Sequence, residues 1–202
     1  MKQAALLPGV LVLLLSIFVT ACGDSEGMIK ENDGMSKKNV ARFESEKYFE
    51  SLRGFPTAQF NLGCCYRDGL GVAKNSAEAA KWFRKSADQG HAPAQNSLGL
   101  CYRDGEGVVK DPVEGAKWIT KSAKQGHAYA QHNLAALYQD GVGVAKDQVE
   151  AYAYYNLASI VEEVSRKWRD KLEEKMSPEA LLRGQQRTKE LQKEIEAEKA
   201  GK

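Results

Sequence analysis

Glycine pairs, histidines and cysteines are the residue types in this 202-residue sequence whose spacing could support chemistry. Gly-x-Gly occurs at Gly69–Gly71, Gly105–Gly107 and Gly141–Gly143, and glycine-rich turns can cradle phosphate groups. Each turn follows a predicted helix, not a strand, and lacks the Lys-Ser/Thr pair of a P-loop. We therefore interpret these glycines as helix-capping turns, and we expect no phosphate site and no cofactor.

The sequence contains three histidines. His91 and His127 lie 36 residues apart in equivalent predicted turns, and His132 lies on a predicted helix. Equivalent positions on stacked helices are about 10 Å apart. Two such residues cannot share a zinc ion, because each ligand bond is only about 2.1 Å long. We predict no metal site and expect the turn histidines to be solvated.

Three of the four cysteines lie in the second quarter of the chain or just after it. Cys65 and Cys101 are 36 residues apart, at a position that Leu137 holds after another 36 residues, so we predict buried apolar side chains. Their separation exceeds the roughly 7 Å between α-carbons that a disulfide tolerates. Whether Cys64 is exposed and pairs between chains stays open at this point.

Catalysis and nucleic-acid binding have little support in the sequence. No Ser-His-Asp or Cys-His-Asn arrangement occurs in a strand-turn context, and the carboxylates are spread over predicted helix surfaces. The 29 basic and 27 acidic side chains leave a formal charge of only +2, which does not favour a nucleic-acid partner. We predict no catalytic residue, no small-molecule substrate and no enzyme activity.

The N-terminus has the pattern of an export signal. Lys2 precedes an apolar run over Ala4–Val19, and the run ends in Val19-Thr20-Ala21-Cys22. That ending resembles the bacterial lipobox, which implies that residues 1–21 are a lipoprotein signal peptide and that Cys22 is the site of lipid attachment. A retained signal anchor and a coincidental cysteine are the alternatives. Residues 22–39 are polar and form, on this interpretation, the lipidated cysteine and a flexible tether.

The lipobox resemblance places the protein in the cell envelope, facing the periplasm, with the membrane as a partner through the N-terminal lipid. The choice between inner and outer membrane stays open. Gly23 follows Cys22 directly, and the absence of an aspartate there favours the outer membrane.

The strongest signal is an internal repeat. Residues 58–93 and residues 94–129 are identical at 23 of 36 aligned positions without a gap, and a third copy begins at Ala130. Within each copy, apolar residues recur with helical spacing in two segments, the first on Ala58, Leu62 and Tyr66. Asp68-Gly69 ends this first helix, because glycine accepts the left-handed conformation that a helix C-terminus often needs. Each unit is therefore predicted to be a helical hairpin.

Motifs within the unit resemble those of the Sel1-like repeat family, relatives of the tetratricopeptide repeats. They are Leu62-Gly63, Gly69-Leu70-Gly71-Val72 and Ala80-Lys81-Trp82-Phe83. The resemblance implies an all-α fold, a short right-handed α-solenoid of helix-turn-helix repeats with N- and C-terminal capping helices. Its predicted parts are an N-terminal capping helix at 40–57, repeats at 58–93, 94–129 and 130–165, and a C-terminal capping helix and tail at 166–202.

The C-terminal cap is predicted from two local signals. The second helix of the third repeat is expected to run on over Tyr152–Ser165. Ser177-Pro178-Glu179 is typical of a helix start, and Leu191 and Ile195 lie on one stripe of the helix that follows. We expect that helix to fold back over the last repeat.

Stacking explains the positions that stay constant between repeats, so variable positions on the first helices are the candidate binding residues. By analogy with tetratricopeptide solenoids, these positions line the concave face. The predicted stripe consists of Thr57, Phe60, Cys64, Arg67, Pro93, Asn96, Leu100, Arg103, Tyr129, His132, Ala136 and Gln139. We expect a membrane-anchored scaffold or adaptor that binds an unidentified envelope protein or peptide there. The alternative is a hydrolase of cell-wall or β-lactam substrates.

Overall fold

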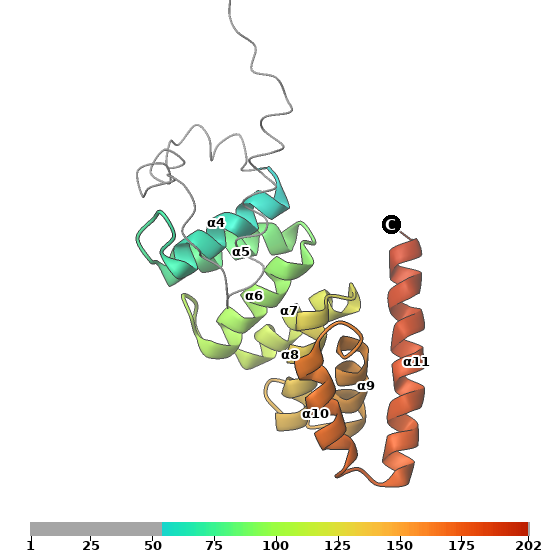
Figure 1. Ribbon diagram of the computed structural model, residues 1–202. Helices are drawn as coiled ribbons and strands as arrows, with labels where there is room; N and C mark the ends of the chain where they lie inside the picture. The colour runs from blue at the N-terminus through green and yellow to red at the C-terminus, as the bar shows by residue number, and fades with distance from the viewer. Residues whose placement is uncertain (1–53, 202) are drawn as a thin grey trace, which may run out of the picture.

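The computed structural model describes residues 54–201 and shows eight helices within that range (Figure 1). The helices are α4 (Pro56–Asp68), α5 (Ser76–Asp88), α6 (Ala92–Asp104), α7 (Pro112–Lys124), α8 (Ala128–Asp140), α9 (Gln148–Ala158), α10 (Glu163–Glu173) and α11 (Pro178–Ala200). The first six form three hairpins, which stack one after another. We call α4, α6 and α8 the A helices, and α5, α7 and α9 the B helices.

Local sequence signals begin and end the helices of each hairpin. The A helices end at Gly69, Gly105 and Gly141, which have positive φ angles of 75°, 79° and 74°. The B helices begin after side-chain caps. The side-chain oxygen of Asn75 accepts hydrogen bonds from the amides of Ala77 and Glu78. Asp147 likewise accepts two amide hydrogen bonds at the start of α9, and Asp111 accepts one, from Glu114, at the start of α7. The predicted helical hairpins are confirmed.

Hydrogen bonds that repeat with the period of the sequence join the two helices of each hairpin and also join one hairpin to the next. The hydroxyl of Ser86 donates to the carbonyl of Pro56, and that of Ser122 donates to the carbonyl of Ala92, both at 2.6 Å. The Gln95 side chain then crosses to the preceding hairpin and donates to the carbonyl of Ala87. Because both serines and Gln95 are buried, these bonds satisfy polar groups that would otherwise destabilise the core.

The fold is an α-solenoid of helical repeats, as predicted. Its A helices begin two residues before the predicted repeat starts at 58, 94 and 130. α6 begins at Ala92 and α8 at Ala128, two residues after Gly90 and Gly126. These glycines have φ angles of 85° and 82° and turn the chain out of the preceding B helix. The histidine after each glycine is therefore the N-cap residue of an A helix.

The expectation of one long helix over 152–165 is wrong. α9 ends at Ala158, and a separate helix, α10, begins at Glu163. The break lets α10 pack against α9 where the first helix of a fourth hairpin would lie. Leu172 of α10 thereby joins the core of the third repeat and is 6% exposed. Burial of this side chain, which a continuous helix would carry into solvent, explains the break.

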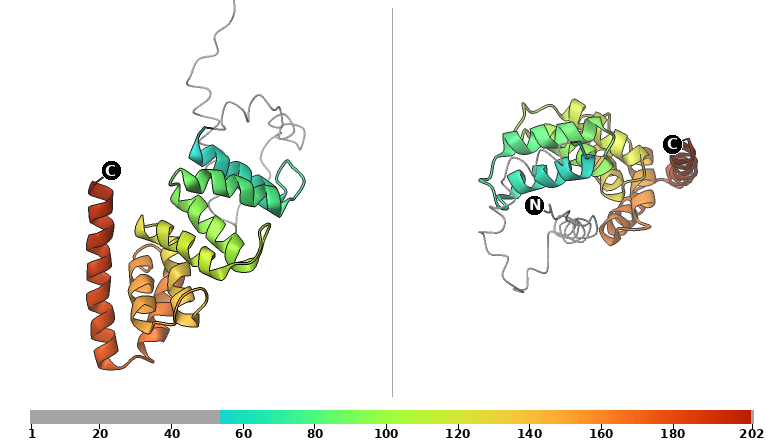
Figure 2. Two further views of the ribbon diagram at one scale, coloured as in Figure 1. Left: turned by 180° about the vertical axis from the view of Figure 1, so that it is seen from behind. Right: turned by 90° about the horizontal axis from the view of Figure 1, so that it is seen from above.

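Helix α11 begins where the sequence predicts it, with Ser177 capping the amide of Ala180. It runs back along the solenoid, packs chiefly on α9 and reaches α7 near its C-terminal end (Figures 1 and 2). Leu191 and Ile195 are buried against the third repeat, and Arg187 forms an ion pair with Glu150 of α9 at 2.7 Å. Among residues 54–201, none of the helices combines the length and the apolar character that crossing a membrane requires.

Candidate functional site

A groove lies across the three A helices, mostly along their N-terminal halves, and has a volume of about 350 Å³. Side chains from α4, α6 and α8 contribute to it in turn. It is lined by Thr57, Phe60, Asn61, Arg67, His91, Pro93, Asn96, Ser97, His127 and Tyr129. We call this feature the A-helix groove. Its volume is within the range of roughly 300–1,000 Å³ that is usual for ligand sites.

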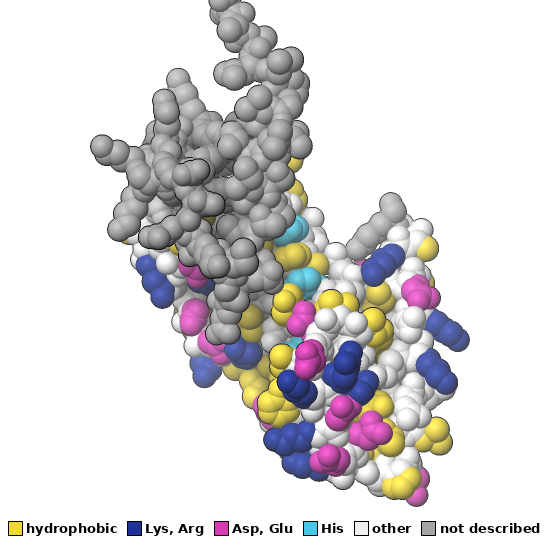
Figure 3. Space-filling view, viewed as in Figure 1, with side chains coloured by type: hydrophobic (Ala, Val, Ile, Leu, Met, Phe, Trp, Pro, Cys, Tyr) yellow, Lys and Arg dark blue, Asp and Glu magenta, His cyan; other side chains and the backbone are white. Residues whose placement is uncertain are grey.

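Aromatic rings form much of the groove wall. The ring of Phe60 lies 5.7 Å from that of Phe83 in the core and 5.2 Å from that of His91. His127 and Tyr129 form a similar pair, with ring centroids 5.9 Å apart. On this face of the molecule, histidine side chains lie among hydrophobic ones in the same band (Figure 3). Anchored aromatic groups of this kind supply much of the binding energy at protein interfaces.

The two groove histidines are half-buried, so the prediction of solvated turn residues is wrong. Burial lowers the pKa of His91 below its usual value of 6.5. Burial also lowers the pKa of His127, and the nearby His91 adds to that effect. In each ring, Nδ1 is buried and makes no hydrogen bond within the described structure. Both rings are consequently neutral at pH 7 and extend the apolar wall.

Arg67 is the single charged residue among those that line the groove, and its charge is balanced locally. The guanidinium donates two hydrogen bonds of 2.8 Å to the carboxylate of Asp68. The same contact holds the pKa of Asp68 below its usual value of 3.8. Asn96 accepts a hydrogen bond of 3.0 Å from Asn133, so one amide of the floor is also fixed in place. The groove is therefore apolar and amide-lined, with little net charge.

The structure brings together six of the twelve residues of the predicted stripe: Thr57, Phe60, Arg67, Pro93, Asn96 and Tyr129. The others lie elsewhere. Leu100 packs against the core of the third repeat, and Arg103 forms an ion pair with Asp104 at 2.7 Å. Gln139 lines a separate hollow beside Trp168.

Cys64 does not belong to the surface stripe. Its side chain is 0% exposed and packs in the core cluster that contains Phe83 and Leu98. A partner at the groove therefore cannot contact it, and it cannot form a bond between folded chains. The spacing argument failed here because position 64 faces the neighbouring helices across the stack instead of the concave surface.

Within residues 54–201, His132 and Ser165 form a histidine–serine contact, with Nδ1 and Oγ 2.9 Å apart. It does not make a nucleophile. Ser165 is 0% exposed, and the ring of His132 packs edge-on against Tyr155 at 5.4 Å. Because no substrate can reach the hydroxyl, the pair fastens α10 to α8. Within the described range, no group of three or more His, Cys, Asp or Glu residues is arranged to hold a metal ion.

Sequence reasoning missed four groove residues: Asn61, His91, Ser97 and His127. The signal for the histidines was present, because Gly-His-Ala precedes α6 and α8 at the same point of the repeat. Because the two histidines recur at the same point of the repeat, the sequence alone indicates structural turn residues and not part of a binding surface. These histidines belong to the groove because the ring of His91 contacts Phe60 and the ring of His127 contacts Tyr129. The spacing of residues within the repeat does not reveal these contacts.

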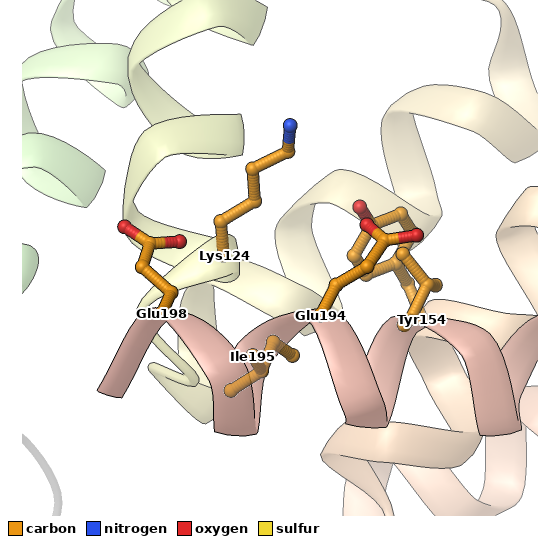
Figure 4. A pocket seen from close by; sticks show the side chains of 6 residues that line it. Lys124, Tyr154, Glu194, Ile195 and Glu198 are labelled. Carbon is orange, nitrogen blue, oxygen red and sulfur yellow. The ribbon is translucent and has the colours of Figure 1, made fainter. Parts of the chain in front are cut away.

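A second crevice, of about 170 Å³, lies between α7, α9 and α11. Figure 4 shows Lys124 of α7 beside Glu198 of α11, and Glu194 beside Tyr154 of α9. Glu194 accepts a hydrogen bond from Arg187 at 3.0 Å, and burial raises the pKa of the Tyr154 hydroxyl. Because its floor consists of Leu191 and Ile195, which hold α11 in place, we interpret this crevice as part of the cap contact.

Comparison with known proteins supports the fold. Part of the chain, 49 residues long, is 45% identical to the rat protein "DAP3-binding cell death enhancer 1". The match covers 23% of this chain and 10% of the rat protein. A Sel1 repeat protein from Oxalobacter formigenes has a similar crystal structure, with a TM-score of 0.53 and 36% identity. That match covers 61% of this chain and 49% of the other.

A protective antigen of uropathogenic Escherichia coli, which displays an SLR fold, is also similar, with a TM-score of 0.69 and 29% identity. The match covers 80% of this chain and 38% of that one, so the chain spans less than half of each similar protein. The family model described as "Sel1 repeat" matches residues 56–91, 92–127 and 128–159, which begin and end with the observed hairpins. This chain belongs to the Sel1 repeat family.

Proposed function

We propose that this protein is a membrane-tethered scaffold of the bacterial cell envelope that holds a partner protein or peptide in the A-helix groove. Sel1 repeats generally mediate protein–protein interaction. The observation that carries the proposal is the groove itself. It is a preformed surface of aromatic rings and amides that all three hairpins build together. A surface with anchored rings and little charge suits a protein segment better than a sugar or a nucleic acid.

The tether is supported by residues that lie outside the described range. Val19-Thr20-Ala21-Cys22 resembles a lipobox at the end of an apolar run, and a lipid on Cys22 would anchor the chain. One similar structure is that of a protective antigen, a description that fits a protein of the cell envelope. On this proposal the solenoid faces the periplasm, and the outer membrane is the favoured anchor site.

Site-specific photocrosslinking in living cells tests the partner. A photoreactive residue is placed at Tyr129 or Pro93 in the groove, and, as the matched control, at Val109, which is 87% exposed on the α6–α7 loop. We expect the same protein, identified by mass spectrometry, to be crosslinked from both groove positions and not from Val109. A Tyr129→Glu substitution should abolish the product formed from Pro93. If the groove positions and the control give the same products, or none, the proposed function is wrong.

Lipid labelling tests the tether independently. Cells fed an alkyne analogue of palmitate should label the wild-type chain, and membrane fractionation should recover it with one of the two membranes. The Cys22→Ala variant should lose the label. A labelled Cys22→Ala chain would contradict lipid attachment at that residue, while the proposal for the groove would still stand.

A further inference from the structure

Helix α10 ends the stack of hairpins, and one of its faces is open. Helices α6 and α8 each pack against the B helix before them and the B helix after them, whereas α10 packs against α9. Helix α11, which comes next in the chain, runs back along α9 and α7 (Figure 1). Among residues 54–201, the side of α10 that faces away from α9 therefore stays exposed to solvent.

The N-terminal half of this open face is apolar. Val164 and Trp168 are four residues apart, and Val161 lies three residues before Val164, so the three side chains follow one stripe of the helix. They are 74%, 54% and 39% exposed in chain order. The ring of Trp168 stacks on Tyr155, with centroids 6.5 Å apart, and is thereby held in place. A row of exposed apolar side chains marks a contact surface more often than scattered single ones do.

The same stripe becomes basic toward the C-terminal end of α10. Lys171 and Lys175 continue it over the next two turns, and the Nζ atom of Lys171 lies 5.2 Å from the ring centroid of Trp168. With Lys146 of the α8–α9 loop, these residues line a hollow of about 260 Å³. On the face shown in Figure 3, Lys and Arg side chains gather at the lower edge, beside this end of α10.

The hollow carries a surplus of positive charge. Its lining includes three lysines and one carboxylate, that of Asp140, which leaves two positive charges unbalanced. The lysine ion pairs within residues 54–201 involve Lys81, Lys117 and Lys167, and none of the three lysines of the hollow. The hollow therefore offers positive charge that an anionic partner can neutralise.

An apolar stripe that leads into a group of lysines matches the chemistry of an anionic lipid surface. Valine and tryptophan side chains pack at the boundary between acyl chains and head groups, and lysines reach the phosphates of the head groups. A soluble anion would occupy the hollow but leave Val161 and Val164 in water. An apolar protein segment would cover the valines but leave the lysines without counter-charges. A lipid surface satisfies both halves of the face.

We propose that this face of α10, with the hollow beside it, docks on an anionic lipid surface. We call it the α10 face and define it as Val161, Val164, Trp168, Lys146, Lys171 and Lys175. The apolar residues pack against the acyl chains, and the lysines bind the phosphates. No residue lines both this hollow and the A-helix groove, so the inference does not depend on what the groove binds.

Photocrosslinking of the full chain to vesicles tests the inference. A photoreactive residue replaces Val164 or, as the matched control, Val113. Each is the second residue of its helix, and both are 54% exposed. The vesicles contain phosphatidylcholine alone or phosphatidylcholine with phosphatidylglycerol, and mass spectrometry counts the lipid adducts. We expect adducts from Val164 with the anionic vesicles, several-fold fewer with the neutral ones, and few from Val113 with either.

Charge reversal tests the lysines. The Lys146→Glu substitution should reduce the Val164 adducts about five-fold or more, because one basic group near an anionic surface contributes roughly that factor. Lys110, which is 36 residues earlier and also exposed on its loop, provides the matched control. The Lys110→Glu variant has the same net charge and should give the wild-type yield.

Four results would overturn the inference. Equal yields from Val164 and Val113, or yields that do not depend on phosphatidylglycerol, would show that α10 does not dock. An equal loss in Lys110→Glu would mean that net charge alone draws the chain to the vesicles. Suppression by soluble glycerol 3-phosphate, but not by the same concentration of chloride, would assign the hollow to a soluble phosphate ester. A Val164 crosslink to a protein instead of lipid in living cells would assign the face to a protein partner.

Discussion

Gly99 and Gly115 face each other where α6 packs against α7, and neither position has room for a side chain. A β-carbon on Gly99 would lie 2.8 Å from the carbonyl oxygen of Gly115, and one on Gly115 would lie 2.7 Å from that of Gly99. The equivalent pair in the third repeat is Ala135 and Ala151. The middle hairpin thus brings its two backbones closer together than two alanines would allow.

The Gly99→Ala substitution is expected to lower the free energy of unfolding by about 1–2 kcal/mol. The added methyl meets backbone that cannot rotate away, at a cost of roughly 2–3 kcal/mol. Alanine recovers only about 1 kcal/mol of helix propensity. Urea unfolding followed by circular dichroism measures the difference. Ser97→Ala, two residues earlier on the same helix, serves as the control and should change stability little. A Gly99→Ala chain as stable as the wild type would show that the helices separate easily.

Substitution of Leu191 and of Leu182 tests whether the packing of α11 on the third repeat stabilises the fold. Leu191 is 1% exposed, and its replacement by alanine should cost about 2–4 kcal/mol of unfolding free energy. Leu182 lies on the same helix but is 68% exposed, so Leu182→Ala should cost less than about 0.5 kcal/mol. Thermal unfolding of the two variants measures the contrast. Equal melting temperatures would mean that α11 is not held against α9 in solution.

Stability should fall with acid because of the groove histidines. Burial lowers the pKa values of His91 and His127 in the folded chain below 6.5, their value when unfolded. The unfolded chain therefore binds more protons as the pH falls below about 6.5, and acid favours unfolding. Above that pH both states are neutral and the effect is absent. The melting temperature should drop between about pH 7.5 and pH 5.5, and the drop should shrink in a His91→Gln, His127→Gln double variant.

Binding at the groove should follow the same titration. Protonation of His91 and His127 places positive charge in an otherwise apolar groove wall, so a partner segment that packs apolar side chains there should dissociate more readily near pH 5.5. Fluorescence anisotropy of a labelled peptide copied from the crosslinked partner measures this, at a temperature where circular dichroism shows the chain to be folded. Tighter binding at low pH would point instead to an acidic partner.

The buried cysteines should resist thiol reagents. Cys101 is 7% exposed, and burial raises the pKa of its thiol to about 11, so little reactive thiolate forms at neutral pH. Cys64 and Cys65 are also buried. We expect Ellman's reagent to titrate these three thiols slowly in the native protein and within minutes in guanidinium. Rapid reaction of Cys64 in the native state would contradict its place in the core.

The repeat hairpins could be predicted from sequence because their signals are local. Gly69 permits a left-handed helix end, and Asn75 and Asp111 cap the next helices within three residues of themselves. A 36-residue period then requires the hairpins to stack. None of these steps depends on contacts between distant parts of the chain.

The boundary between α9 and α10 and the groove both depend on contacts between distant parts of the chain. Nothing between Ala158 and Glu163 is a strong helix breaker, and the chain turns there because Leu172 finds burial on the third repeat. The groove likewise depends on Phe60 meeting His91 from a different hairpin. A surface stripe drawn from helical spacing placed Phe60 and Tyr129 correctly in the groove but assigned Cys64 to the wrong face.

Helices α10 and α11 both pack on α9, one in the place of a fourth A helix and the other along the stack. A further hairpin added after the third would have to displace them and expose Leu172 and Leu191. Duplication of a 36-residue unit can therefore lengthen this array only upstream of α8. In evolution, such an event would extend the A-helix groove at the N-terminal end of the array and leave the C-terminal end unchanged.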